Sequence, residues 1–205
     1  RVAALSGLSR VGGSEAGELV TLALADDSPA VQMAALEALS RMPRVGQRAV
    51  DPLVGFETSD PEVEAALAHA LGSLDDAGDE RVRMRLRKLA RSGSPGARLF
   101  AIAGLTRLQD PALDELLTLA LADSDTEIVK QAVIALAEAG GSRAGARLAV
   151  ALSHPAWDVR RLAAVWIARL RATDAEAALR GQLAREGDEY VRVALRDAIA
   201  SLEAR

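Results

Sequence analysis

Apolar and polar positions follow a pattern that returns at regular intervals along the chain. The segments ELVTLALADDSPAV (Glu18 to Val31) and ELLTLALADSDTEI (Glu115 to Ile128) are identical at 8 of 14 positions. With the last residue of each segment as an anchor, equivalent positions follow one another at intervals of 32, 34, 31, 31 and 32 residues. Such a period predicts a stack of similar units. The six anchors are Val31, Val63, Ala97, Ile128, Val159 and Val191.

Each anchor opens a segment with the hydrophobic spacing of an α-helix. Apolar residues recur four, eight and eleven positions after the anchor, and these positions share one helical face. We expect this segment to be the second helix of each unit. The predicted core residues are Ala35, Leu39, Met42; Leu67, Leu71, Leu74; Ala101, Leu105, Leu108; Ala132, Leu136, Ala139; Ala163, Ile167, Leu170; and Leu195, Ile199, Leu202.

A short polar stretch precedes each anchor, and a further amphipathic segment lies upstream of it. The stretches DDSP, SDP, GSP, DSDT, HPAWD and GDE contain residue types that begin helices. Upstream, Leu19, Leu22 and Leu24 show helical periodicity. Each unit is therefore predicted to be helix, tight turn, helix, and the opening RVAALSGLSRVGG fits a second helix without its partner.

The predicted fold class is all-α. Small residues seven positions after the anchor, such as Ala38 and Gly104, allow neighbouring helices to approach within roughly 8 to 10 Å. The units can then bury one continuous core, so we expect an α-solenoid, a superhelix of six helix-turn-helix repeats preceded by half a repeat. The predicted single domain, 1–205, has units at 1–13 (partial), 14–43, 46–75, 79–109, 111–140, 142–171 and 173–203.

The second helices share a motif. VRRLAAVWIARL (Val159 to Leu170) and VRVALRDAIASL (Val191 to Leu202) begin with Val-Arg and continue with small apolar residues, and VQMAALEALSRM and VEAALAHALGSL show the pattern without the Arg. This pattern resembles the HEAT repeat family, in particular the short Ala-rich repeats of the phycobilisome-lyase type. The resemblance covers essentially the whole chain and implies the α-solenoid fold. It implies little about activity, because such arrays serve many purposes.

The composition offers few residues for metal binding or catalysis. The 205 residues include no Cys and only two His, His69 and His154, neither of which has a second metal ligand at suitable spacing. We therefore expect no metal, no cofactor and no catalytic residues, and predict that the protein is not an enzyme. The Gly12-Gly13 and Gly140-Gly141 pairs lie where helices should end rather than in a phosphate loop.

The sequence also suggests where the protein works. No apolar run reaches the roughly 18 residues that a membrane helix needs. Lys88 and Lys130 are the only Lys residues among 25 basic residues, an Arg bias typical of GC-rich genomes. We expect a bacterial, cytoplasmic protein. Because the first residue is Arg1 rather than Met, we expect a piece of a longer chain, whose upstream residues could hold a signal peptide or a further domain.

The stretch RVRMRLRKLAR, residues 81–91, alternates basic and apolar residues as a half-buried strand would. The repeat register instead predicts a first helix, with Val82, Leu86 and Leu89 on one face and Met84 pointing outward. Long Arg side chains can lie along an apolar seam with their charges in water, so a solvated convex face is the simpler interpretation. The alternative is a contact for an acidic partner, made by Arg81, Arg83, Arg85, Arg87, Lys88 and Arg91.

The preferred binding site is the concave side, which second helices line in HEAT arrays. Positions two, five and six after each anchor would face it, and they are more apolar than a solvated surface requires. Position five, as in Leu36, Ile102 and Val133, could instead be core between repeats. An exposed groove here would suit an amphipathic helix or an extended peptide. Its candidate residues are Met33, Leu99, Ile134 and Val165.

Both tryptophans fall in one unit. Trp157 occupies a turn position that is Pro in three other units, and Trp166 occupies position seven, which is Ala or Gly elsewhere. Trp166 could fill space between repeats, and Trp157 could cover a helix start. Alternatively, they form an aromatic hot spot, because Trp and Arg dominate interface energetics. Its other residues would be Arg160, Arg161 and Arg169.

The predicted function is that of an interaction scaffold or regulatory module whose partner is another protein or peptide. The repeat subtype leaves open a lyase or chaperone-like subunit acting on a tetrapyrrole-bearing protein, and the chain could also be a passive module of a larger bacterial enzyme. A DNA-binding or DNA-glycosylase-like role is a minor alternative. Nucleic acid is disfavoured because the net charge is −4 and the arginines form no continuous stripe.

Charge is unevenly distributed along the chain. Residues 1–80 hold 5 basic and 14 acidic residues, a net charge of −9, whereas residues 81–205 hold 20 and 15, a net charge of +5. This asymmetry could orient a charged partner within the screening length of about 8 Å at physiological salt.

Overall fold

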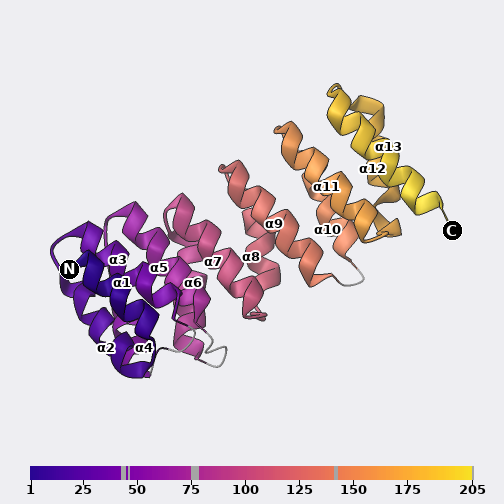
Figure 1. Cartoon of the computed structure of the whole chain (residues 1–205). Coiled ribbons are helices and arrows are strands. Elements are labelled where there is room, and N and C mark those ends of the chain that lie inside the picture. The colour runs from indigo at the N-terminus through magenta and orange to yellow at the C-terminus, as the bar shows by residue number, and fades with distance from the viewer. Residues whose placement is uncertain (43–44, 46, 75–78, 141–142, 205) are drawn as a thin grey trace. The chain divides into compact units, whose positions relative to one another are not determined.

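The computed structural model describes residues 1–42, 45, 47–74, 79–140 and 143–204 (Figure 1). These residues form thirteen α-helices and two short 3-10 helices, with no strand among them. The predicted all-α class is confirmed, and residues 81–91 are helical rather than extended. The predicted unit boundaries at 43, 46, 75 and 142 lie outside the described residues. The count of six repeats and the single-domain organisation stay predictions.

The chain forms two compact units, Arg1–Leu116 and Leu117–Arg205. In unit 1, helices α1, α3, α5 and α7 pack side by side in one row, and α2, α4 and α6 pack against that row. The second helices of the repeats thus form one layer and the first helices another. The bounds are α1 Val2–Val11, α2 Ser14–Thr21, η1 Leu22–Ala25, α3 Pro29–Ser40, α4 Gln47–Gly55, α5 Pro61–Ser73, α6 Glu80–Ser92, α7 Pro95–Arg107 and α8 Leu113–Ala120, which crosses the boundary between units.

Unit 2 repeats this two-layer arrangement. Its second helices α9, α11 and α13 pack in a row, while α10 packs against α9 and α11, and α12 against α13. The bounds are α9 Thr126–Ala139, α10 Ala144–Ala151, α11 Trp157–Arg169, η2 Thr173–Ala175, α12 Glu176–Arg185 and α13 Glu189–Glu203.

The predicted hydrophobic positions form the cores of both units. All six anchors and all residues four and eight positions after them are buried. Of the residues eleven positions after the anchors in unit 2, Ala139 and Leu170 are exposed at the ends of α9 and α11, so the prediction is wrong for them, and Leu202 is half-buried. The described residues of unit 2 leave this end of the two helices uncovered. The equivalent Met42, Leu74 and Leu108 of unit 1 are buried.

The polar stretches start the second helices as predicted. Asp60, Ser94, Asp125 and Asp188 each lie three positions before an anchor and accept hydrogen bonds from backbone N–H groups of the helix that follows. These bonds satisfy N–H groups that have no partner within the helix. Helices α3 and α11 differ, because Ser28 makes no side-chain cap hydrogen bond and Ala156 has no polar side chain to make one.

Helices α5 and α7 approach closely at two glycines. A methyl group at Gly104 would lie 2.7 Å from Cα of Gly72, which is closer than a real side chain can come. The two backbones therefore touch, and each glycine is required by its partner across the helix pair. This contact sets the spacing of the exposed side chains on the same two helices.

Candidate functional site

The exposed side of the α3, α5 and α7 row, away from the first helices, is called here the second-helix face of unit 1. Met33 is 37% exposed on it and Leu99 is half-buried, whereas Leu36 and Ile102 are fully buried. Position five therefore belongs to the core, and position two reaches the surface. Phe100, which the repeat pattern did not single out, is 38% exposed on the same face.

A cleft of about 400 Å³ opens on this face between α5 and α7. The rings of His69 and Phe100 form its walls, with centroids 5.0 Å apart and planes tilted by 42°. Gly72 and Gly104 line the cleft where the two helices meet, and they have no side chains to fill the space. Arg107 closes one end by donating to the carbonyl oxygens of Gly72 (2.7 Å) and Leu74. The lining residues are His69, Gly72, Ser73, Phe100, Ala103, Gly104 and Arg107.

The sequence could have indicated this cleft only indirectly. Position seven identified Gly104 as a place of close helix approach, but Gly72 lies nine positions after its own anchor and shows no periodic signal. Which side chains border the contact depends on how the helices cross.

On the corresponding face of unit 2, the predicted groove residues Ile134 and Val165 are half-buried, and Val133 is fully buried. Trp166 is also half-buried, and the guanidinium carbon of Arg169 lies 5.0 Å from the centre of its ring. This is a cation–π contact. Trp166 and Arg169 thus engage each other on the helix surface.

Trp157 is 48% exposed at the first residue of α11. Its ring lies 6.1 Å from that of Tyr190, in the first turn of α13, with the planes tilted by 40°. Arg161 is exposed one turn beyond Trp157. The sequence identified Trp157 and missed Tyr190, although the two occupy neighbouring positions in successive turns.

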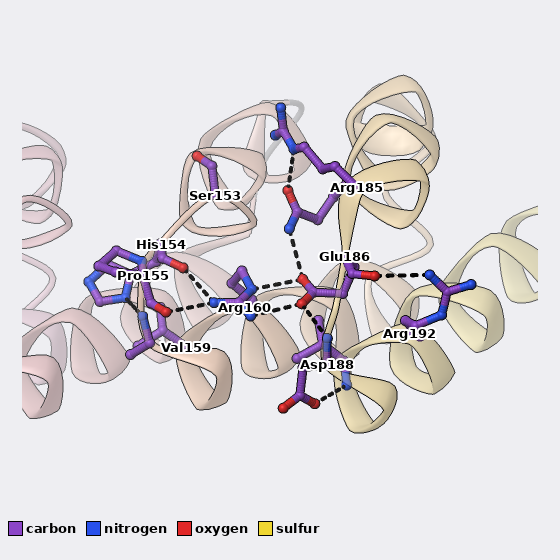
Figure 2. Close-up of polar contacts among 12 residues, drawn as sticks. Ser153, His154, Pro155, Val159, Arg160, Arg185, Glu186, Asp188 and Arg192 are labelled. Atoms are coloured by element: carbon purple, nitrogen blue, oxygen red, sulfur yellow. Dashed lines mark hydrogen bonds and ion pairs between the residues drawn. The ribbon is translucent and has the colours of Figure 1, made fainter.

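Arg160, predicted as a partner-binding residue, is engaged within unit 2 (Figure 2). Its Nε and Nη2 each donate to the Glu186 carboxylate at 2.8 Å, and Nη1 donates to the carbonyl oxygens of His154 (2.9 Å) and Pro155 (2.7 Å). The guanidinium therefore joins the turns before α11 and α13, and a role of Arg160 in partner binding stays a prediction.

Glu186 is the centre of this network. Its side chain is 2% exposed and also accepts hydrogen bonds from Gln182 (2.8 Å) and the backbone N–H of Asp188 (3.0 Å). The hydrogen bonds and positive charge of Arg160 lower the pKa of Glu186 from 4.5 to about 2, against the opposing effect of burial. An open cleft of about 510 Å³ lies over the network, lined in part by Ser153, His154 and Arg185. The ion pair of Arg160 and Glu186 links the turn before α11 to the turn before α13.

The basic helix α6 packs as the register predicts. Val82, Leu86 and Leu89 are buried, and Met84 is 54% exposed. Within the predicted basic patch, the side chain of Arg85 is only 9% exposed and bonds to Glu57 (2.9 Å) and the carbonyl oxygen of Phe56 (2.8 Å). The patch as a partner contact stays a prediction.

The other cations of α6 also find acidic residues of unit 1. Arg81 pairs with Asp51 and Asp79, Lys88 with Glu57, and Arg91 with Glu115. Arg83 and Arg87 both reach Asp110, whose side chain has no exposed surface. Acidic residues from both sides of the basic helix in the sequence therefore compensate its charge within unit 1, which leaves little charge for an acidic partner.

We expect Asp110→Asn to destabilise unit 1 by about 1 to 3 kcal/mol, because two guanidinium groups would lose their carboxylate. Burial alone would raise the pKa of Asp110, but hydrogen bonds from Arg87 and from the Ala112 N–H lower it below 3.8. The carboxylate form therefore stabilises the fold near neutral pH and ceases to do so in acid. Urea unfolding followed by circular dichroism measures the change. The control Glu80→Gln, which removes an exposed partner of Arg87, should cost far less, and equal losses would contradict the prediction.

The described residues also bear on metal binding and on membrane insertion. They contain no cluster of three or more His, Asp or Glu side chains placed to hold a metal ion. None of the helices within the described ranges combines the length and the apolar character needed to cross a bilayer.

Comparison with known proteins agrees with the geometry. The model of the HEAT repeats family matches residues 1–72 and 54–137. No curated protein matches the chain. An engineered protein of known structure has a TM-score of 0.58 at 18% identity, covering 92% of this chain and 99% of its own. A designed armadillo repeat protein has 0.53 at 20%, covering 90% and 99%. Another, in complex with the peptide (KR)4, has 0.51 at 18%, covering 98% and 92%.

Proposed function

The chain belongs to the HEAT repeat family, and from this we propose that it is a protein-interaction module that binds an extended peptide on the second-helix face of unit 1. The observation that carries the proposal is the cleft between α5 and α7. We propose a binding role without catalysis.

The shape of the cleft suits one apolar side chain of a peptide. Gly72, Gly104, Ala103 and Phe100 offer contacts to carbon atoms, while the side chains of His69 and Ser73 can hydrogen-bond to a peptide backbone. Met33 and Leu99 add apolar surface on the same face. The designed armadillo repeat protein of similar fold supports the proposal, because it was determined in complex with a peptide, (KR)4.

Selection from a random peptide library displayed on phage, with the purified chain as target, tests the proposal. We expect enriched peptides to share an apolar residue and to bind at least about tenfold more weakly to Ala103→Glu, which would place a carboxylate against the apolar wall. Phe100→Ala should weaken binding in the same direction by removing one wall. Fluorescence anisotropy of the labelled peptides measures both.

Met84→Glu is the matched control, since it adds the same charge at an exposed apolar residue of the first-helix layer. Binding to this variant should equal that of the wild type. Enriched peptides that bind equally well to Ala103→Glu and Phe100→Ala, with circular dichroism spectra showing folded variants, would rule out the cleft as the binding site.

A further inference from the structure

Unit 2 carries a second exposed surface, formed by Trp157, Tyr190, Val193 and Arg161 and called here the aromatic surface. We infer that it docks an acidic peptide segment, in which an apolar residue packs on the two rings and a neighbouring carboxylate pairs with Arg161. This inference concerns different residues from the cleft of unit 1 and does not depend on it.

The two rings are held together by helix packing. Trp157 and Tyr190 lie in the first turns of α11 and α13, neighbours in the second-helix row. Arg161 follows Trp157 by four residues and Val193 follows Tyr190 by three, so each lies on the same helical face as its ring. Tyr190 is 74% exposed and Val193 47%. The result is an apolar surface with one cation beside it.

Folding alone does not account for these aromatic residues. The chain has only two Trp, one Tyr and two Phe. Two of these five residues, Trp157 and Tyr190, are exposed to solvent with their rings next to each other. The position of Trp157 is occupied by Pro29, Pro61 and Pro95 at the starts of three other second helices, where the ring of proline suits a first helical residue. Exposed aromatic residues that contribute little to a core are typical of binding hot spots.

The charge of Arg161 favours an acidic segment over a basic one. Arg160 of α11 and Arg196 of α13 are paired with Glu186 and Glu189, and Lys130 of the neighbouring α9 is paired with Asp158. Arg161 differs, because the structure shows no ion-pair or hydrogen-bond partner for its side chain among the residues it describes. A carboxylate arriving beside Trp157 would pair with Arg161 without breaking an internal contact, whereas a basic segment would be repelled.

Acidic residues of α13 limit how many carboxylates the docked segment can carry. Asp197 is exposed on α13 one turn beyond Val193, and Glu189 lies beside Tyr190. The positive site is therefore confined to the α11 side of the aromatic surface. We expect one or two acidic residues flanking an apolar residue rather than a long acidic tract.

Two synthetic peptides test the inference, the fluorescein-labelled ELPELPEL and its counterpart KLPKLPKL with Lys in place of Glu. Anisotropy should show saturable binding of the acidic peptide to the full chain with a Kd of about 10⁻⁵ to 10⁻⁴ M, and at least about tenfold weaker binding of the basic one. Trp157→Ala and Tyr190→Ala should each weaken binding of the acidic peptide about tenfold. Arg161→Glu should reverse the preference between the two peptides.

Arg169→Gln and Phe100→Ala are the controls. Arg169 is another exposed arginine of α11 but contacts Trp166, and Phe100 belongs to the cleft of unit 1, so neither change should alter binding of the acidic peptide. Equal binding of the two peptides, no binding of the acidic peptide at about 1 mM, or full binding by Trp157→Ala would overturn the inference. Loss on Phe100→Ala alone would place the acidic peptide in the cleft and would also overturn it.

Discussion

Arg160→Ala is expected to lower the free energy of unfolding of unit 2 by about 3 to 5 kcal/mol, because it leaves the buried carboxylate of Glu186 without its cation. The guanidinium makes four hydrogen bonds, two to Glu186 and two to backbone carbonyl oxygens in the turn before α11. Alanine would also release those carbonyl oxygens, so the substitution should loosen the start of both α11 and α13.

Tryptophan fluorescence during urea unfolding measures this change, since both tryptophans lie in α11. The neighbouring Arg161→Ala is the matched control. Its side chain is exposed, so its effect should stay within about 0.5 kcal/mol. Similar losses in the two variants would show that the Arg160 network does not stabilise the turns.

The same network should give unit 2 a pH-dependent stability. The pKa of Glu186 is lowered in the folded state from 4.5 to about 2, so its ionised form stabilises the fold. This contribution, about 3 kcal/mol, is complete above the unfolded pKa near 4.5 and is lost as the pH falls through about 2. Urea midpoints measured across this window should fall more steeply for the wild type than for Glu186→Gln, which has no carboxylate to protonate.

Gly104→Ala is expected to destabilise unit 1 by about 2 to 3 kcal/mol, although alanine is the better helix former. The added methyl group would lie 2.7 Å from Cα of Gly72, and a backbone atom cannot move aside as a flexible side chain can. Helices α5 and α7 would have to separate, which would loosen the most extensive helix pair of unit 1 and widen the cleft at His69 and Phe100.

Gly7→Ala is the matched control, because Gly7 lies within α1 and a methyl group there would meet no atom within 4 Å. This change should instead stabilise the protein, by about 0.5 to 1 kcal/mol. Circular dichroism during urea unfolding compares the two, and the expected result is a change of opposite sign. A stabilised Gly104→Ala variant would contradict the close approach of α5 and α7.

Sequence patterns predicted some residues of the candidate sites and missed others. Met33 and Trp157 were identified from their repeat positions and are exposed. Phe100 and Tyr190 were not identified, because their repeat positions were not among those that the periodic pattern singled out. Arg85 and Arg160 were interpreted as surface cations because an Arg is normally solvated, and each is instead bonded to a glutamate from another part of the chain.

The sequence by itself determined the all-α class, the helix-turn-helix register and most core positions. These follow from the spacing of apolar residues and from the helix-capping residues, both of which recur in each unit. Tertiary structure alone decided which charges are compensated and where apolar surface remains exposed. The partners of Arg85, Arg87 and Arg160 lie 23 to 28 residues away, at distances that no local pattern encodes. The cleft above Gly72 and Gly104 likewise depends on two helices crossing at a point that the individual helices do not specify.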